Sequence, residues 1–319
     1  MAPRRRSKKA GPPKTGFPKT GGVLIWKPVG ITSRDAVDQA ERTLAGGPLG
    51  HTGTLDPLAE GLLLLLGGEA RKFQALLTDH DKAYRASVTF GIQSISDDGE
   101  GPLFCPVPRP ELPDRDRLES ALDRFRGGYE QIPPGHSAIR IDGQRAWKRV
   151  RRGETVTMPA RAVKISRCDL VSFDGTTATI DVACGSGTYI RSLARDLGDE
   201  LGCGAYLSGL ARTELGGLSA DEATPLDALT PEHWGSLESL VTALPRIEVD
   251  DAARDRLALG QRVPIPALPD EPDATSTAAI PRVLWCGDEV VGLGELRGKV
   301  VQPRRWIRRE ATPESERDS

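Results

Sequence analysis

The sequence predicts an α+β fold, in which a mixed, largely antiparallel sheet forms a large domain and a small β-rich domain follows it. Strand-like and helix-like segments occur in clusters joined by tight turns, without the regular alternation that parallel βαβ units need. After about residue 245 the chain becomes rich in proline and then in short apolar runs separated by glycine. The length of 319 residues, 38% of them hydrophobic, is enough to bury a sizeable core.

The large domain begins with a buried strand. Residues 23–26 are all apolar, and Lys27-Pro28 ends the run. Thr32 or Ser33 is then expected to cap a helix, because apolar residues recur at helical spacing after it. These residues are Val37, Ala40 and Leu44. A leucine-rich strand follows, and then a helix that carries Ala70, Phe73, Leu76 and Leu77.

Strand signals are clearest in the middle of the chain. Residues 84–90 alternate between apolar and polar, which predicts a strand with one buried face. Residues 162–173 and 177–184 are predicted to pair across a turn at Asp174-Gly175. The expected buried face of the second strand carries Ala178, Ile180, Val182 and Cys184. Two helices complete this region, one around residues 118–125 and one that Thr188 is expected to cap.

Composition predicts the domain boundaries. Residues 21–245 form the large domain and residues 246–309 the small one, which contains a mobile loop or linker at 267–281. Residues 1–20 carry seven Lys and Arg and no acid. They are expected to be a disordered basic arm, which either contacts a polyanion or only aids solubility. Residues 310–319 are expected to be a disordered polar tail.

Composition also excludes several classes of protein and site. The longest apolar run, residues 62–66, is far shorter than the ~20 residues of a membrane-spanning helix. No apolar segment of a secretory signal follows the basic N-terminus. The five cysteines show no C-x-x-C spacing and the four histidines no H-x-x-x-H spacing, so neither a disulfide framework nor a metal site is expected. No phosphate-binding loop or dinucleotide fingerprint is present, and no cofactor is predicted.

Residues 50–61, with the sequence GHTGTLDPLAEG, form the most unusual turn-rich segment. Asp56 lies between a leucine and a proline, in a loop whose shape the glycines and the proline constrain. A carboxylate with apolar neighbours has few local hydrogen-bond donors, which points to a functional group; an ordinary turn residue before proline is the alternative interpretation. From the residues alone, the default role of His51 is that of a turn histidine and the default role of Tyr84 is core packing.

Five motifs occur in a fixed order along the chain. They are Lys27-Pro28, GHTGTLDPLAEG, Asp81-Lys82-x-Tyr84, GSGTYIRSLARDLG at residues 185–198 and LGCGAYLSGLAR at residues 201–212. In these motifs and their order the chain resembles the TruB family, the bacterial tRNA pseudouridine synthases that act on uridine at position 55 in the T-loop. The resemblance covers roughly residues 21–245 and implies a pseudouridine-synthase-type catalytic domain there. By analogy, it implies a PUA-like RNA-binding barrel at 246–309.

The resemblance also implies site residues. Asp56 matches the catalytic aspartate, and Arg191 matches an arginine that pairs with this carboxylate. Lys27 is expected to support the site without taking part in the chemistry. The expected substrate-binding residues are His51, Tyr84, Tyr189 and Leu210.

The implied reaction suits these residue types. Isomerisation breaks the N1–C1′ bond of uridine, rotates the base and rejoins it through C5, without metal, redox or ATP chemistry. Asp56 either attacks C1′ or removes a 2′ proton, and Arg191 is expected to lower the pKa of Asp56 and keep it charged. Tyr84 is expected to stack on the detached base, which is worth ~1–3 kcal/mol. His51 is expected to fill the space that the flipped uridine leaves.

Two basic segments are expected to bind RNA phosphates. One is residues 140–152, within a segment at 130–155 that the resemblance implies is a mobile RNA-contacting loop; the other is residues 297–309. The expected partner is the T-arm of tRNA. His136 and Trp147 stand where the family commonly has tyrosines.

Other functions remain open on the residues. A non-catalytic tRNA-binding protein or tRNA-folding chaperone would use the same basic surfaces. A glycoside hydrolase needs two carboxylates that flank the bond, and Glu60 is the local candidate for the second. The chain is expected to be a cytoplasmic monomer that requires no cofactor, metal or membrane.

Overall fold

The computed structural model describes residues 20–45, 47–106, 108, 110–137, 139–141, 143–150, 152–154, 157–265 and 279–308. The expectations for the basic arm before residue 20, for 267–278 and for the tail at 310–319 lie outside the described residues. Within the described residues, no helix is long and apolar enough to cross a membrane.

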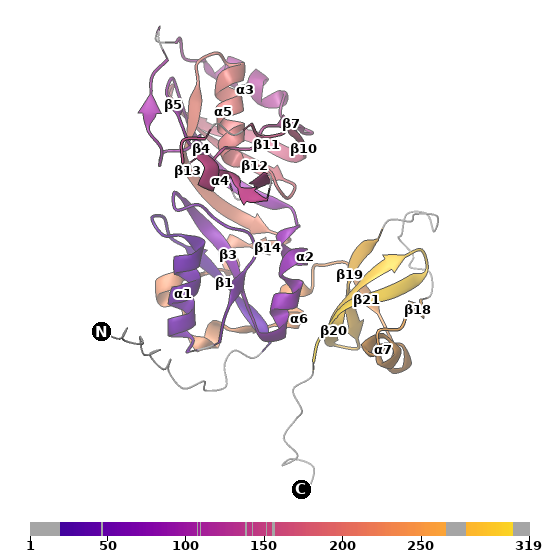
Figure 1. Cartoon of the computed structure of the whole chain (residues 1–319). Helices are drawn as coiled ribbons and strands as arrows, with labels where there is room; N and C mark the ends of the chain where they lie inside the picture. Colours follow the sequence, from indigo (N-terminus) through magenta and orange to yellow (C-terminus); the bar gives the residue numbers. More distant parts are fainter. Residues whose placement is uncertain are drawn as a thin grey trace, which may run out of the picture.

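A large mixed sheet forms the centre of the first domain (Figure 1). Its main strands, in spatial order, are β11 (Ile165–Phe173), β12 (Thr177–Cys184), β4 (Lys82–Phe90), β13 (Ala205–Leu215), β3 (Ala59–Gly67), β1 (Gly21–Lys27) and β15 (Thr224–Pro225). Along this order β13 pairs with β3 and β1 with β15 in parallel, and the other neighbours are antiparallel. The predicted fold class, with a mixed and largely antiparallel sheet, is confirmed.

Helices cover this sheet at both of its ends. Helix α1 (Ser33–Thr43) packs on β1 and β3 through Ala36, Val37 and Ala40. Thr32 caps it reciprocally: Asp35 N donates to Thr32 Oγ1 over 3.1 Å, and Thr32 N donates to Asp35 Oδ2 over 2.9 Å. At the other end α3 (Arg115–Asp123) and α5 (Ile190–Glu200) pack on β4, β11 and β12.

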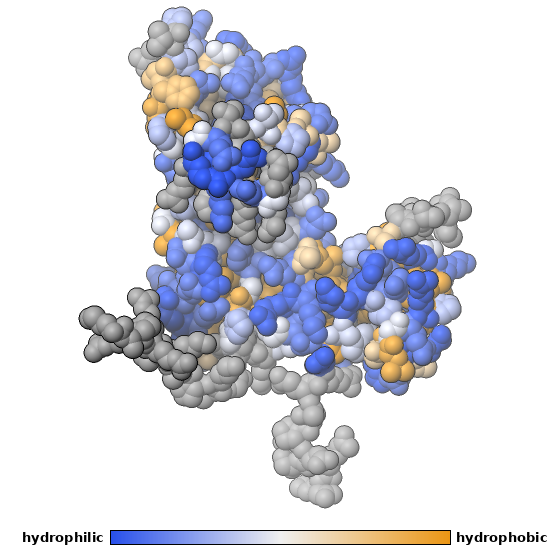
Figure 2. Space-filling model, viewed as in Figure 1, coloured by the Kyte–Doolittle hydropathy of each residue, from blue (hydrophilic) through white to orange (hydrophobic). Residues whose placement is uncertain are grey.

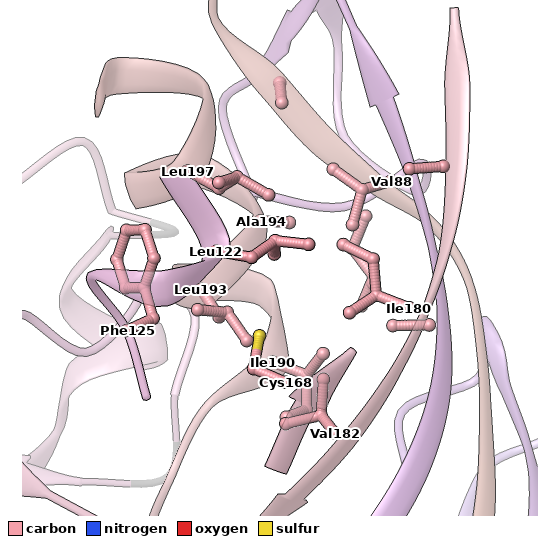
Figure 3. Close-up of a cluster of buried hydrophobic side chains, with 14 of the residues drawn as sticks. Val88, Leu122, Phe125, Cys168, Ile180, Val182, Ile190, Leu193, Ala194 and Leu197 are labelled. Carbon is pink, nitrogen blue, oxygen red and sulfur yellow. The ribbon is translucent and has the colours of Figure 1, made fainter. Parts of the chain in front are cut away.

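The core under α3 and α5 follows the alternation of the strands (Figure 3). Val88, Ile180 and Val182 point from β4 and β12 toward Leu193 and Leu197 of α5, and all five are buried. The predicted inward faces of β4 and β12 are therefore confirmed. The predicted cap of α5 is wrong: Thr188 Oγ1 bonds the Gly185 carbonyl over 3.0 Å, and Tyr189 stands at the N-cap without a side-chain cap.

The second sheet belongs to the C-terminal part of the chain. Its strands, in spatial order, are β17 (Arg246–Glu248), β19 (Ile280–Cys286), β20 (Glu289–Arg297), β21 (Val300–Trp306) and β18 (Val263–Pro264), with helix α7 (Asp251–Ala258) beside them. Trp285 and Val290 join an apolar cluster with Phe73 and Val241 of the first domain. Lys72 Nζ also donates to the Trp306 carbonyl over 2.7 Å. The C-terminal sheet therefore contacts the first domain through both apolar packing and a hydrogen bond.

Outside the segment at 130–155 the described residues also form short helices. They are a 3₁₀ helix (Gly68–Phe73), α2 (Gln74–Thr78), α6 (Leu237–Val241) and three further 3₁₀ turns (Ala220–Glu222, Leu226–Ala228, Pro231–His233). The remaining short strands are β2 (Gly50–His51), β5 (Gln93–Ser94), β6 (Leu103–Phe104), β14 (Leu218–Ser219) and β16 (Gly235–Ser236).

The segment expected to be a mobile loop at 130–155 contains regular structure in its described part. Strand β7 (Tyr129–Gln131) pairs with β10 (Arg161–Val163). A hairpin of β8 (Arg140–Ile141) and β9 (Gln144–Arg145) leads into helix α4 (Ala146–Val150). Figure 2 shows a hydrophilic surface over α4. The mobility and RNA contacts of this segment stay predictions.

Candidate active site

A cavity of about 350 Å³ lies where the turn before β3, strands β4 and β13 and the start of α5 meet. Five of the seven predicted site residues line it, namely Asp56, Tyr84, Tyr189, Arg191 and Leu210. Lys27 and His51 are not among the lining residues. Segments far apart in the sequence thus place most of the predicted residues around one space large enough for a nucleoside.

The loop that carries Asp56 is fixed by the start of α1. Ser33 is buried, and its Oγ accepts from Leu55 N over 2.8 Å and donates to the Leu55 carbonyl over 3.0 Å. On the other side of the aspartate, Gly30 N donates to the Pro57 carbonyl over 2.8 Å. The backbone on both sides of Asp56 is therefore held, which orients its carboxylate without using it as a turn acceptor.

Lys27 stabilises the turn next to this loop. Its side chain is fully buried, and Nζ donates to the carbonyls of Pro28 and Ile31 over 2.8 and 2.7 Å. Burial lowers the pKa of Lys27, while the charges of Asp56 and two glutamates act against this shift. Lys27 thus lies behind the Asp56 loop, and this position suits the supporting role expected for it.

Arg191 connects two carboxylates at the edge of the cavity. Arg191 Nε lies 3.1 Å from Asp56 Oδ2, and Arg191 NH1 lies 3.2 Å from Asp98 Oδ2. The guanidinium is buried, with 8% of its side chain exposed, whereas 42% of the Asp56 side chain is accessible. Asp56 therefore faces the cavity while its partner is held behind it.

Arg191 was expected to lower the pKa of Asp56, but burial has a larger effect in the opposite direction. Burial raises the pKa of Asp56 above its ordinary value of 3.8, Arg191 lowers it, and the neighbouring charge of Asp98 raises it again. The net direction is upward, because the effect of burial is larger than that of Arg191 and the charge of Asp98 adds to it. Burial and the second carboxylate were both invisible in the sequence motif.

Asp98 is a site residue that sequence reasoning missed. It is buried, its Oδ1 accepts from Ser96 Oγ over 2.6 Å, and the same oxygen accepts from Glu100 N over 3.1 Å. In the sequence it belongs to the run Asp97-Asp98-Gly99-Glu100, which is typical of an exposed turn. Only its burial against Arg191 distinguishes it from its neighbours.

A second buried residue that the sequence did not reveal, Gln131, positions Tyr189. Its side-chain amide donates to the Tyr189 carbonyl over 3.0 Å and accepts from Tyr189 N over 2.8 Å. The Arg161 guanidinium lies over the Tyr189 ring, with its central carbon 5.0 Å from the ring centroid. The tyrosine is thus fixed at the mouth of the cavity, directly before the helix that carries Arg191.

Tyr84 and Arg212 also line the cavity, and they are register partners on the neighbouring strands β4 and β13. Both residues are buried, and the charge of Arg212 lowers the pKa of the Tyr84 hydroxyl against the larger raising effect of burial. Arg212 Nε also donates to the Leu62 carbonyl over 2.7 Å, and NH2 donates to the Gly53 carbonyl over 3.2 Å. Gly53 has φ +76, and a Cβ there would lie 3.3 Å from Arg212 NH1, so glycine suits this position.

His51 and His136 occupy different places. His51 lies on β2 outside the cavity lining, and burial together with the charge of Arg212 lowers its pKa, so it is neutral at pH 7. His136 lines the cavity, and its backbone carbonyl accepts from Arg191 NH2 over 3.1 Å. That contact does not depend on the side chain. The side chain of Trp147, the other departure from the family pattern, lies outside the described residues.

This arrangement suits chemistry at a single carboxylate. Glu60, the expected second carboxylate of a glycoside hydrolase, does not line the cavity and accepts from Trp26 Nε1 over 3.4 Å. Among the described residues no group of three or more His, Cys, Asp or Glu is placed to hold a metal ion. The cavity offers one accessible carboxylate, two tyrosine rings and two buried arginines.

Sequence comparison finds relatives along almost the whole chain. A family model described as "TruB family pseudouridylate synthase (N terminal domain)" matches residues 42–190. A protein of Cupriavidus metallidurans named tRNA pseudouridine synthase B is 38% identical over 297 residues, which cover 90% of this chain and 94% of the relative. A protein of Ralstonia nicotianae with the same name is 37% identical over 318 residues, which cover 96% of this chain and 99% of that relative.

Structural comparison finds the same fold in more distant proteins. A chain from the "Crystal Structure of a Cbf5-Nop10-Gar1 Complex" superposes with a TM-score of 0.68 at 22% identity, and covers 90% of this chain and 84% of its own. One from the "Structure of H/ACA RNP bound to a substrate RNA containing 2'-deoxyuridine" gives 0.66 at 20% identity, with coverages of 91% and 85%. At these identities the likeness concerns the fold.

Proposed function

The chain belongs to the TruB family of pseudouridylate synthases, and from this premise we propose that it isomerises uridine to pseudouridine at position 55 of tRNA. The single observation that carries the proposal is the accessible carboxylate of Asp56 in a nucleoside-sized cavity, with Arg191 3.1 Å away. The relatives named tRNA pseudouridine synthase B support the class of reaction and of substrate.

Asp56 acts on the ribose of the target nucleotide. In one route its carboxylate attacks C1′ and displaces the uracil; in the other it removes the 2′ proton, and the uracil leaves to give a glycal. Both routes need the ionised carboxylate. Arg191 keeps a positive charge beside Asp56 in either case, so it offsets part of the free energy that burial of the ionised form requires.

The cavity holds the base while it turns. The target uridine leaves its stack to reach Asp56, and Tyr84 provides a ring against which the detached uracil stays, which is worth ~1–3 kcal/mol. Tyr189 and Leu210 line the same space and limit how the base can rotate. His51, on β2 just before the Asp56 loop, is the proposed filler of the vacated stack.

The T-arm is the proposed binding partner, and its phosphates are the proposed contacts. In the described part of the C-terminal sheet, basic residues without an intervening acid run along β21 and the turn before it. These are Arg297, Lys299, Arg304, Arg305 and Arg308. Such a run binds phosphates without reading sequence. Residues 246–309 therefore remain proposed as an RNA-binding domain, and 21–245 as the catalytic one.

A non-catalytic tRNA-binding protein or folding chaperone is the alternative that the family membership does not favour. Neither function uses a buried arginine shared by two carboxylates at a cavity, which is costly to bury unless the charge is used. We propose that the protein is a monomer that acts in the cytoplasm. Light scattering of the purified protein tests the monomer.

One assay tests the proposed function directly. The purified full chain is incubated with an unmodified tRNA transcript, and pseudouridine is mapped at each uridine. We expect modification at position 55 alone and none in a transcript in which cytidine replaces that uridine. A minihelix of the T-arm tests the partner. Wild-type protein that binds tRNA but modifies no uridine would support the chaperone alternative.

A further inference from the structure

Arg212 carries a buried positive charge that no carboxylate among the described residues neutralises. It is 1% exposed, yet in that part of the chain it forms no ion pair. It donates hydrogen bonds to the carbonyls of Leu62 and Gly53, and its charge also acts on the hydroxyl of Tyr84, its register partner on β4. Burial of an unpaired guanidinium is unfavourable, and burial lowers the pKa of Arg212. An unneutralised charge at a cavity wall points to an anion that is present only during function.

The two arginines of the cavity differ in this respect. Arg191 is shared by Asp56 and Asp98, so this group of three residues has one net negative charge. Arg212 has only neutral partners, and Lys82 lies near it with Nζ bonded to the carbonyls of Thr78 and His80 over 2.8 and 2.6 Å. The cavity is therefore lined by an anionic group around Asp56 and by a cationic group of Arg212 and Lys82.

Tyr84 and Arg212 are register partners on β4 and β13, and both line the cavity. The charge of Arg212 acts on the Tyr84 hydroxyl and lowers its pKa against the larger effect of burial. A guanidinium can only donate hydrogen bonds, so a contact between the two groups uses the tyrosine oxygen as acceptor and leaves its hydrogen for an acceptor in the cavity. A hydroxyl that accepts from a cation is a stronger donor, because the charge polarises the O–H bond. Tyr84 lines the cavity on the strand that faces the Asp56 loop.

We propose that Arg212, acting through the Tyr84 hydroxyl, stabilises the uracil anion that is released when the N1–C1′ bond breaks. This inference rests on the proposed function and adds a positioning residue to it. When the bond breaks, its electron pair moves to the base, and the negative charge spreads over N1, O2 and O4. C1′ either forms a bond to an Asp56 oxygen or, after loss of the 2′ proton to Asp56, a double bond to C2′.

The later steps balance without a further co-reactant. C5 of the rotated uracil attacks C1′ and releases the Asp56 oxygen, or adds to the glycal as the 2′ proton returns. The C5 proton then leaves as N1 takes up a proton, so the ring ends neutral. The base is anionic only between cleavage of the N1–C1′ bond and formation of the C5–C1′ bond. Arg212 and Tyr84 stabilise this anion. In this assignment Asp56 contacts the electron-poor C1′, and Arg212 and Tyr84 act on the base.

Single-turnover rates of the full-length enzyme on a tRNA transcript test this assignment. Arg212→Gln removes the charge, and we expect the rate of pseudouridine formation to fall roughly 10²–10³-fold, the range seen when one preorganised donor to a developing anion is lost. Arg212→Lys keeps a charge there and should lose less than about tenfold. The dissociation constant of tRNA should stay within about twofold for both variants.

A second transcript, with 5-fluorouridine at the target, separates this role from a structural one. Fluorine makes uracil a more acidic, better leaving group, which needs less help to carry charge. The deficit of Arg212→Gln, measured as loss of the 5-fluorouridine nucleoside, should shrink at least tenfold relative to uridine. A deficit of the same size on both substrates, or a full rate with uridine, overturns the proposal.

Two further variants keep the test decisive. Tyr84→Phe removes only the hydroxyl through which Arg212 acts, so it should show the same dependence on the leaving group even if Arg212→Gln fails to fold. Arg117→Gln is the matched control, because Arg117 also donates to a backbone carbonyl but does not line the cavity. Its NH2 group donates to the Leu201 carbonyl over a distance of 2.8 Å. This variant should leave both rates unchanged. Wild type inactive on uridine would instead refute the proposed function.

Discussion

The interior of the first domain and the surface of the C-terminal sheet use charge in opposite ways. Among the described residues, every buried charged side chain belongs to the first domain. These are Lys27, Lys82, Asp98, Arg191 and Arg212. In the C-terminal sheet the ion pairs are exposed, as in Arg246–Glu248, where each side chain is more than half accessible.

We propose that this difference separates residues that act in the chemistry from residues that bind RNA. A buried charge interacts strongly, since little water screens it, and its removal changes the energy of a neighbouring charge by several kcal/mol. An exposed charge contributes mainly to salt-dependent attraction of a polyanion. We therefore expect changes in the cavity to alter the rate with little effect on tRNA affinity, and changes on the C-terminal sheet to do the reverse.

Asp56→Asn should give the largest effect. The substitution is nearly isosteric, and tRNA affinity should stay close to that of wild type because binding depends on groups spread over the surface. Pseudouridine formation should fall below detection, since either route needs an ionised oxygen. The burial that raises the pKa of Asp56 also makes its charge unfavourable, so the Asn variant should melt higher at neutral pH.

The matching control is the pH dependence of that stability difference. Because the pKa of Asp56 is higher in the folded state, its ionisation destabilises the fold as the pH rises past the unfolded value. Near or below the ordinary pKa of 3.8 wild type is protonated, and the difference should vanish. Pseudouridine made by the Asn variant at a wild-type rate would falsify the assigned mechanism.

Tyr84 should come next. Tyr84→Leu removes the ring, and with it ~1–3 kcal/mol of stacking on the base, so activity should be lost. Tyr84→Phe keeps the ring, so tRNA affinity should be retained while turnover falls through the missing hydroxyl. Rapid-mixing assays under single turnover, with filter binding of tRNA in parallel, measure both. If the Tyr84→Leu variant is active, Tyr84 is a core residue and does not act on the base.

The pH dependence of the rate of pseudouridine formation should show a smaller effect than the substitutions of Asp56 and Tyr84. The rate should fall with decreasing pH at a midpoint above 3.8, because burial raises the pKa of Asp56. Asp98→Asn removes a negative neighbour that also raises this pKa, so it should move the midpoint to lower pH. An unchanged midpoint in this variant would mean that protonation of Asp56 does not cause the fall in rate at low pH.

Removal of residues 1–19 should change binding alone. These residues carry seven positive charges, so the truncated chain should bind tRNA more weakly, with a flatter dependence of affinity on salt. Thr20 is kept because its hydroxyl accepts from Glu69 N over 3.3 Å. The modified uridine should be the same. An unchanged salt slope would identify the arm as a solubility segment.

The smallest effect is expected from Arg304→Ala. This arginine forms an exposed pair with Glu295 over 2.6 Å, and such pairs contribute little to stability. The melting temperature and the single-turnover rate should not change, and tRNA affinity should fall slightly at low salt. A change in rate equal to that of a cavity variant would contradict the division between the two regions.

The sequence by itself determined the features that reside in neighbouring residues. Alternation predicted β4 and β12, because side chains of a strand point to opposite faces. Gly and Pro around Asp56 marked a loop of fixed shape, and the order of five motifs indicated the family. The predicted cap of α5 was wrong because the helix begins at Ile190, so Tyr189 and not Thr188 occupies the N-cap position.

Only the tertiary structure decided the charges of the site. Asp98 and Arg191 are 93 positions apart, and Arg212 reaches the Leu62 carbonyl across 150 positions. No local pattern reports such contacts. The direction of the Asp56 pKa was mistaken for the same reason, since desolvation depends on what surrounds a group and not on what adjoins it in the chain. Motifs identified the proposed catalytic aspartate, whereas burial determined how its charge is balanced and left Arg212 without a counter-charge among the described residues.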